Sequence, residues 1–263
     1  FGETDFPKYI YKKFKGKKNY IIIDLTRKNI FGKDKNSFSV SIGQFGKIIS
    51  ILKKNNCSRV LFAGKVKKPN FAKLKLDVKG IFYIPRIIKK SKLGDAAIIK
   101  EIISIFKKEG VKTIRSNFFT PELTLTKGNY SKYQPDLEDK KNILNALKSL
   151  KKTNPYDHVQ SVVSRNNFIV LEKNEGTEKM LKKIKKKKGI RNGVLVKYPK
   201  KKQDTRVDLP TVGIETLKQC KRAGLKGIVL KHRKNIFLDK SNSIKYANKN
   251  KIFITVKWLK KFL

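Results

Sequence analysis

The most informative segment of the sequence is GVLVKYPKKKQDTRVDLPTVGIETL, residues 193–217. Apolar residues over 193–198 predict a buried strand, the polar run that follows predicts a loop, and Gly213 marks the start of a helix. The same order of strand, loop and helix recurs on both sides of this stretch. Strands that alternate with helices predict an α/β fold whose sheet is largely parallel.

The other expected elements extend this pattern along the chain. The amphipathic run 95–106, with Asp95 as N-cap and Gly110 as the stop, predicts one helix, and Pro135-Asp136 predicts the start of another. Further strands are expected at 20–25, 59–64, from 113 onward, 159–164, 167–171, 227–230 and 252–255, and further helices are expected at 177–187, 213–223, 240–249 and in a segment that ends near 55–56.

The stretch between Thr120 and Gln134 shows no clear periodicity and contains Pro121 and Gly128. A chain of 263 residues fits one or two domains. We therefore place a domain boundary near 128–134 and expect an amino-terminal α/β domain over 1–130 and a carboxyl-terminal one over 131–263.

The chain is strongly basic, with 65 Lys+Arg against 20 Asp+Glu and a formal net charge of +45. Of the basic residues 56 are Lys and 9 are Arg, whereas base-specific recognition favours Arg. We expect no sequence-specific nucleic-acid partner, and an attraction to anionic lipid headgroups and phosphorylated substrates. No apolar run approaches the roughly 18 residues of a transmembrane helix. The two cysteines, Cys57 and Cys220, exclude a disulfide framework and fit a reducing, intracellular compartment.

The loop after the predicted strand 193–198 carries the strongest candidate site. Asp204 and Asp208 could share a divalent cation, which leaves Arg206 and Lys197 for phosphate. Loops at the carboxyl ends of sheet strands are where α/β proteins bind ligands. The competing interpretation is a turn with an Asp N-cap and a surface ion pair.

Three weaker candidates lie elsewhere. The run Glu175-Gly176-Thr177-Glu178 follows a predicted strand, and its alternative is a helix start capped by Thr177. Gly43-Gln44-Phe45-Gly46 precedes a helix whose free N–H groups could hold phosphate. His158 could act as a base, although a loop or core histidine is the commoner case.

These residues together resemble the LpxI-type UDP-2,3-diacylglucosamine diphosphatases of bacterial lipid A synthesis. The strongest match is the run 193–217, with its strand, Lys, Gln-acid-x-Arg-x-Asp-Leu-Pro and Gly. Supporting matches follow in family order along nearly the whole chain: Gly43-Gln44-x-Gly46, Ala63-Gly64-Lys65-Val66 with Pro69, Gly94-Asp95, Pro121-Glu122-Leu123, Glu175-Gly176-Thr177 and Ala223-Gly224-Leu225-x-Gly227-Ile228.

The resemblance implies Mg²⁺-dependent hydrolysis of the pyrophosphate in UDP-2,3-diacylglucosamine to UMP and 2,3-diacylglucosamine 1-phosphate. It also implies a Rossmann-like substrate-binding domain at the amino terminus, without the family's first strand, and a mixed α/β domain that carries the catalytic loop. The expected protein is a cytoplasmic homodimer, peripheral to the inner membrane, where it meets its lipid-linked nucleotide substrate.

The resemblance assigns Asp208 and Asp204 as catalytic and metal-binding residues. It assigns substrate binding to Gly2, Gly43, Gln44, Gly64, Lys65, Thr177, Lys197, Gln203 and Arg206.

The sequence departs from the family pattern at several points. The family's paired acids after the glycine at 94 are here Asp95-Ala96, and its Glu-Gly-Thr-Asp ends in Glu178. The alternative is therefore a basic nucleic-acid-binding or scaffolding protein that keeps the fold without catalysis. Release of UMP from the lipid nucleotide discriminates between the two.

Overall fold

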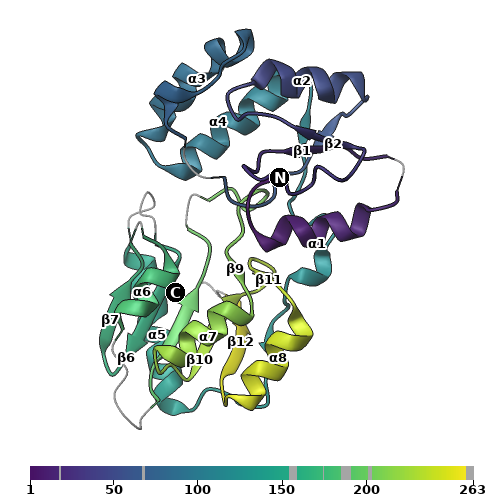
Figure 1. Ribbon diagram of the computed structural model, residues 1–263. Helices are drawn as coiled ribbons and strands as arrows, with labels where there is room; N and C mark the ends of the chain where they lie inside the picture. The colour runs from purple at the N-terminus through teal and green to yellow at the C-terminus, as the bar shows by residue number, and fades with distance from the viewer. Residues whose placement is uncertain are drawn as a thin grey trace. The chain divides into compact units, whose positions relative to one another are not determined.

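The computed structural model describes residues 1–17, 19–66, 69–153, 159–173, 175–184, 191–200 and 203–258 (Figure 1). The chain forms two compact units. The first comprises Phe1–Phe119 and Arg206–Asp208, and the second comprises Thr120–Thr205 and Leu209–Leu263. The predicted mixed α/β class is confirmed.

The chain passes between the units at Phe119 and Thr120, ahead of the predicted boundary at 128–134. The reason is that Gly128–Asn129 already form strand β5, which pairs with strand β12 (Phe253–Lys257) at the edge of the second unit's sheet. A short edge strand of this kind has no apolar pattern, so the sequence gives no sign of it.

The first unit contains two pairs of short parallel strands together with helices. β1 pairs with β2, and β3 pairs with β4. Its elements are α1 (Asp5–Phe14), β1 (Ile22–Asp24), β2 (Ser37–Ser39), α2 (Phe45–Lys54), β3 (Arg59–Val60), the 3₁₀ turn η1 (Phe71–Lys73), α3 (Val78–Ser91), α4 (Asp95–Lys108) and β4 (Lys112–Thr113).

One hydrophobic core holds the first unit together. α2, α3 and α4 each contribute buried apolar residues at helical spacing, among them Ile49, Ile84 and Ile105. The predicted helix over 95–106 is confirmed, and Gly110 ends it with a φ of +83°. Gly94 takes the N-cap position, so Asp95 lies in the first turn, where its charge complements the helix dipole.

The second unit is built on a six-stranded sheet in the order β5-β12-β10-β8-β6-β7. β8, β10 and β12 are mutually parallel, whereas β6 is antiparallel to both β8 and β7. The sheet is therefore mixed rather than largely parallel. The turn Asn166-Asn167, with both φ values positive, makes β6 and β7 a tight hairpin and so forces them antiparallel.

Helices cover both faces of this sheet. α5 packs on one face through Ile143 and Ala146, and α6, α7 and α8 pack on the other. The predicted strands of this half are confirmed, as are its helices at 213–223 and 240–249 and the helix that starts at Pro135-Asp136. The helix predicted over 177–187 ends earlier, at Lys183, because Ile184 is extended, and residues 185–187 lie outside the described ranges. The elements of the second unit not yet given are η2 (Pro121–Leu123), α5 (Leu137–Lys152), β6 (Ser161–Arg165), β7 (Phe168–Leu171), α6 (Thr177–Lys183), β8 (Val194–Lys197), β9 (Thr211–Val212), α7 (Ile214–Arg222), β10 (Gly227–Lys231), β11 (Ile236–Phe237) and α8 (Lys240–Lys249).

The strand register brings the ends of several strands to one edge of the sheet. Lys197, the last residue of β8, is aligned with Ser161, the first residue of β6. Leu171 ends β7 beside Val162, so Glu172 emerges at the same edge. This carboxyl edge of β8 is the position that α/β proteins use for ligands.

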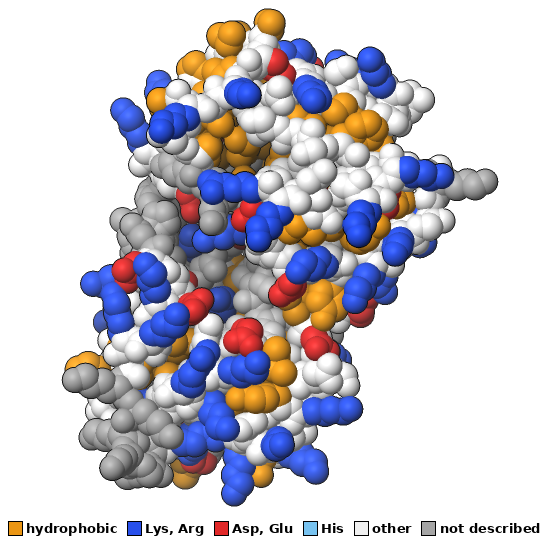
Figure 2. Space-filling view, in the orientation of Figure 1, with side chains coloured by type: hydrophobic (Ala, Val, Ile, Leu, Met, Phe, Trp, Pro, Cys, Tyr) orange, Lys and Arg blue, Asp and Glu red, His pale blue; other side chains and the backbone are white. Residues whose placement is uncertain are grey.

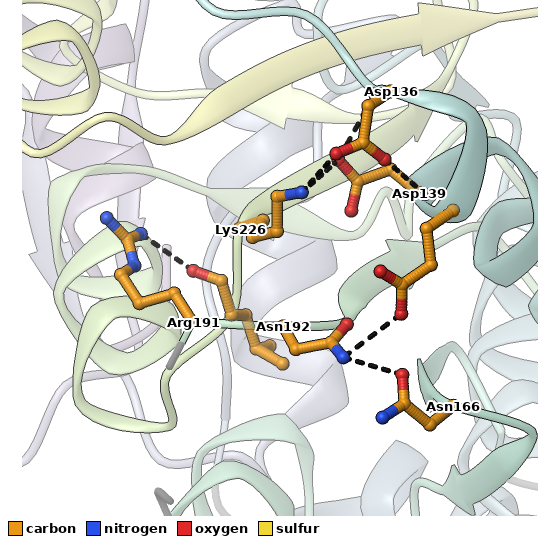
Figure 3. Close-up of polar contacts among 8 residues, drawn as sticks. Asp136, Asp139, Asn166, Arg191, Asn192 and Lys226 are labelled. Carbon is orange, nitrogen blue, oxygen red and sulfur yellow. Dashed lines mark hydrogen bonds and ion pairs between the residues drawn. The ribbon is translucent and has the colours of Figure 1, made fainter. Parts of the chain in front are cut away.

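A polar network secures the opposite edge (Figure 3). Asp136 is the N-cap of α5 and forms a capping box with Asp139. Lys226, which directly precedes β10, binds the carboxylates of both acids, and its ammonium lies 3.1 Å from Asp139. Burial raises the pKa of Asp139, so this carboxylate depends on Lys226 for its charge. The network joins the start of α5 to the start of β10.

We expect Lys226→Met to destabilise the second unit by about 2 kcal/mol, because it leaves the buried Asp139 without its cation. The effect is smaller than for a fully buried pair because Lys226 is partly exposed. Urea unfolding followed by the fluorescence of the single tryptophan, Trp258, measures it. Lys245→Met, on the exposed face of α8, is the control. Equal losses for the two variants would contradict a role for the network.

Candidate active site

Lys197 is the central cation of the site in the second unit. Its side chain is buried, with 9% of the residue exposed, and its ammonium donates to the hydroxyl of Thr177 at 2.8 Å. Burial lowers the pKa of Lys197, and the nearby carboxylate of Glu172 offsets only part of that shift. Among the described residues, Thr177 is the only hydrogen-bond partner of this ammonium, which has three N–H donors.

Thr177 connects Lys197 to an acid and a second hydroxyl. It donates to Glu172 Oε1 at 2.9 Å, and its oxygen lies 2.9 Å from Ser161 Oγ. Because Thr177 has a single hydroxyl hydrogen, we assign Ser161 as the donor in the second contact. Thr177 is the first residue of α6, and the N-cap is Gly176, so the alternative role of Thr177 as a helix cap is excluded.

Gln203 extends this cluster toward the loop after β8. Its carbonyl oxygen accepts from the backbone N–H of Lys200 at 2.9 Å and from Gln160 Nε2 at 3.2 Å. The Gln160 backbone N–H in turn donates to Glu172 Oε2 at 3.0 Å. The Nε2 of Gln203 is buried and has no hydrogen-bond partner among the described residues. A buried donor without a partner is costly, and a ligand oxygen would satisfy it.

The loop acids follow Gln203 directly. Asp204 groups with the second unit, and Arg206 and Asp208 group with the first, where the Ser116 N–H donates to the Arg206 carbonyl at 2.6 Å. Asp204 and Asp208 are each partly exposed, and Arg206 is exposed. Of the two predicted metal ligands, Asp204 therefore belongs to the second unit and Asp208 to the first.

Gly2, Gly64 and Lys65 meet in the first unit. Gly2 donates to the Ala63 carbonyl at 2.9 Å, and a Cβ on Gly2 would lie 2.5 Å from the Lys65 carbonyl oxygen. Gly64 has a φ of +87°, and a Cβ there would lie 2.6 Å from Pro7 Cγ. Only glycine permits this approach of the two backbones. The structure thus brings three predicted substrate residues together.

An internal carboxylate binds the start of α2, which directly follows the Gly43-Gln44 loop. The carboxylate of Asp77 accepts from the N–H groups of Gly46 and Lys47 at the start of α2, and from Gly80 N–H in α3. Burial raises the pKa of Asp77, but these backbone donors together hold it below its ordinary value. The N–H groups predicted to hold phosphate therefore bind an internal carboxylate.

Comparison with known proteins identifies the family. A family model described as the LpxI N-terminal domain matches residues 2–123, and one described as the LpxI C-terminal domain matches residues 126–255. The UDP-2,3-diacylglucosamine pyrophosphatase LpxI of Caulobacter vibrioides is 34% identical over 223 residues, which is 82% of this chain and 80% of that protein. The chain belongs to the LpxI family.

The two LpxI domain matches confirm the family resemblance and the two-domain organisation that it implies. We call Lys197 and the polar residues hydrogen-bonded around it the Lys197 cluster. All of its residues lie within the match to the LpxI C-terminal domain. The sequence does not predict four polar residues of this cluster, because a place next to a strand end, without a distinctive spacing, is a weak signal. They are Gln160, Ser161, Glu172 and Asn235, whose side chain donates to the Lys197 carbonyl at 3.0 Å.

Several other predicted positions lie away from this cluster. Glu175 and Glu178 form surface ion pairs with lysines of α6. Cys220 is buried, which raises its thiol pKa to about 12 and fits a core residue. His158 lies outside the described residues. Across the described part of the chain, no helix has the length and apolar character to cross a membrane.

Proposed function

We propose that the chain hydrolyses the pyrophosphate of UDP-2,3-diacylglucosamine to UMP and 2,3-diacylglucosamine 1-phosphate. The observation that carries this proposal is the buried Lys197–Thr177–Glu172 cluster at the end of β8, the strand that precedes the Gln-Asp-x-Arg-x-Asp run in the sequence, in a chain 34% identical to a UDP-2,3-diacylglucosamine pyrophosphatase. Among the described residues, the buried ammonium of Lys197 uses one of its three N–H donors and the amide of Gln203 has no partner. Both groups can therefore donate to the oxygens of a phosphate.

The main obstacle to hydrolysis is the negative charge on the pyrophosphate oxygens. The negative oxygens of a pyrophosphate repel an incoming water, and Lys197 and Arg206 reduce that repulsion by binding them. Asp208 orients the water and accepts its proton. The water oxygen bonds to one phosphorus as the bridging P–O bond breaks, and each product leaves as a phosphomonoester.

The donor set of the loop fits Mg²⁺. No cluster of three or more His, Cys, Asp or Glu occurs in the described ranges, so a cage built from protein alone is absent there. Mg²⁺ commonly uses only one or two carboxylates and takes its other ligands from water and substrate phosphates. Asp204 and Asp208 can supply those carboxylates. When bound, the metal would neutralise pyrophosphate charge and lower the pKa of water.

The substrate class also suggests where the protein acts. UDP-2,3-diacylglucosamine carries acyl chains, so we place the enzyme in the cytoplasm, peripheral to the inner membrane and attracted to anionic lipid headgroups by its net charge of +45. We propose a homodimer as the working form, and no sequence-specific nucleic-acid partner.

Release of UMP tests this proposal. We expect the purified chain to release UMP from UDP-2,3-diacylglucosamine in detergent micelles when Mg²⁺ is present. Activity should disappear with a chelator and return when Mg²⁺ is added in excess. Activity that persists in the chelator would show that hydrolysis does not require Mg²⁺. No release under any condition, together with salt-sensitive binding to nucleic acid, would favour the scaffolding alternative.

A further inference from the structure

Helix α3 carries apolar residues on two opposite faces. Tyr83, Ile84 and Ile87 are buried in the core of the first unit. On the other face, Val78 is 84% exposed, Ile81 63% and Phe82 67%. A helix that is apolar all round is normally buried all round, so the outer face of α3 is unusual for a surface helix.

Exposed apolar residues also flank the helix in the sequence, with Leu76 before it and Leu93 after it. We define the α3 apolar face as the exposed hydrophobic residues of this segment: Leu76, Val78, Ile81, Phe82, Ile88 and Leu93. In the helix these follow the i, i+3, i+4 spacing of a single stripe. An exposed apolar stripe along a helix marks an interaction site more often than isolated exposed residues do.

The charged residues around the α3 apolar face are almost all basic. Lys89, Lys90 and Lys92 are exposed at its carboxyl end, and Lys73 and Lys75 are exposed before its start. Of the acids of this region, Asp77 binds backbone N–H groups, Glu101 pairs with Arg86 and Glu109 pairs with Lys79, which leaves Asp95, at the start of α4, as the exposed acid near the face. In Figure 2, hydrophobic side chains lie beside blue cationic ones in the part of the view where Figure 1 places α3.

We propose that the α3 apolar face docks on an anionic lipid bilayer. Its apolar stripe would enter the boundary between headgroups and acyl chains, while the flanking lysines extend to the lipid phosphates. Charge complementarity favours this occupant, because each lysine near an anionic membrane surface adds to binding. A second copy docked on the same face would bring two sets of lysines together and be repelled.

This inference deepens the proposed function, because a lipid substrate gives the enzyme a reason to bind the bilayer. Its test does not depend on turnover. The wild-type chain should co-sediment with phosphatidylcholine vesicles that contain phosphatidylglycerol, and bind pure phosphatidylcholine vesicles more weakly. The double variant Ile81→Ser/Phe82→Ser should bind the anionic vesicles at least about tenfold more weakly.

The matched control is Leu137→Ser/Phe168→Ser, which removes an aliphatic and a phenyl side chain that are 83% and 76% exposed in the second unit. The control should bind vesicles as the wild type does, and both variants should keep the wild-type melting temperature and UMP release in detergent micelles. Equal vesicle binding by the α3 variant and the wild type would overturn the proposal. Concentration-dependent dimerisation lost only in the α3 variant, without vesicle binding, would assign the face to a second copy instead.

Discussion

Asp208→Asn should reduce UMP release at least about a hundredfold while the fold remains intact. Asp208 is partly exposed and lies in the loop that follows β8. It belongs to the Arg-x-Asp-Leu-Pro run, which is part of the strongest match to the family pattern. An amide has the same shape but cannot accept a proton or contribute full charge to a cation. Substrate binding should persist in part, because Lys197 and Arg206 remain.

UMP release and melting temperature of the variant and the wild type measure this effect together. Glu215→Gln, an exposed acid in the first turn of α7, is the control for loss of one negative charge and should be fully active. Near-normal turnover in Asp208→Asn would remove Asp208 from the mechanism. A collapsed melting temperature would show instead that Asp208 is structural.

Lys197→Met should lower kcat/KM at least about a hundredfold, because the proposed role of the buried ammonium is to bind the substrate phosphates. Met fills a similar volume without the charge. Lys197→Arg should retain more activity, since it keeps the cation, although its planar fork does not match the geometry of the ammonium.

The pH profile separates a role in binding phosphate from a role in packing. Burial lowers the pKa of Lys197, so the ammonium loses its proton at a lower pH than an ordinary lysine does. Activity should therefore fall as the pH rises through that lowered pKa. In Lys197→Arg this alkaline limb should move to higher pH, because the guanidinium stays charged. An unchanged limb in the Arg variant would assign it to another group.

The sequence predicts the sheet of the second unit well because its strands are short apolar runs with clear ends. β8 and β10 are examples, and both are found within one residue of their predicted bounds. It does not predict α3, because a helix with apolar residues on two faces lacks the single stripe that identifies an amphipathic helix. It also misses α1, where the surrounding lysines obscure a stripe that includes Phe6 and Ile10.

In the candidate site, residues that belong to a local sequence motif were predictable, whereas contacts between residues far apart in the sequence were not. Lys197, Thr177 and Gln203 were predicted and lie in one connected cluster. The phosphate interpretation of the Gly43-Gln44 loop did not anticipate Asp77, because that carboxylate is 31 residues away from Gly46 and reaches α2 only through the fold. Glu172 was missed because a single acid after a strand has no distinctive spacing.

The most direct test of the proposed hydrolysis is the ³¹P NMR spectrum of UDP-2,3-diacylglucosamine incubated with the purified chain and Mg²⁺. We expect the two coupled pyrophosphate resonances to disappear while two uncoupled phosphomonoester resonances, from UMP and 2,3-diacylglucosamine 1-phosphate, grow in equal amounts. Persistence of the pyrophosphate pair, either in intact substrate or in UDP released by cleavage at the sugar, would contradict the proposed hydrolysis.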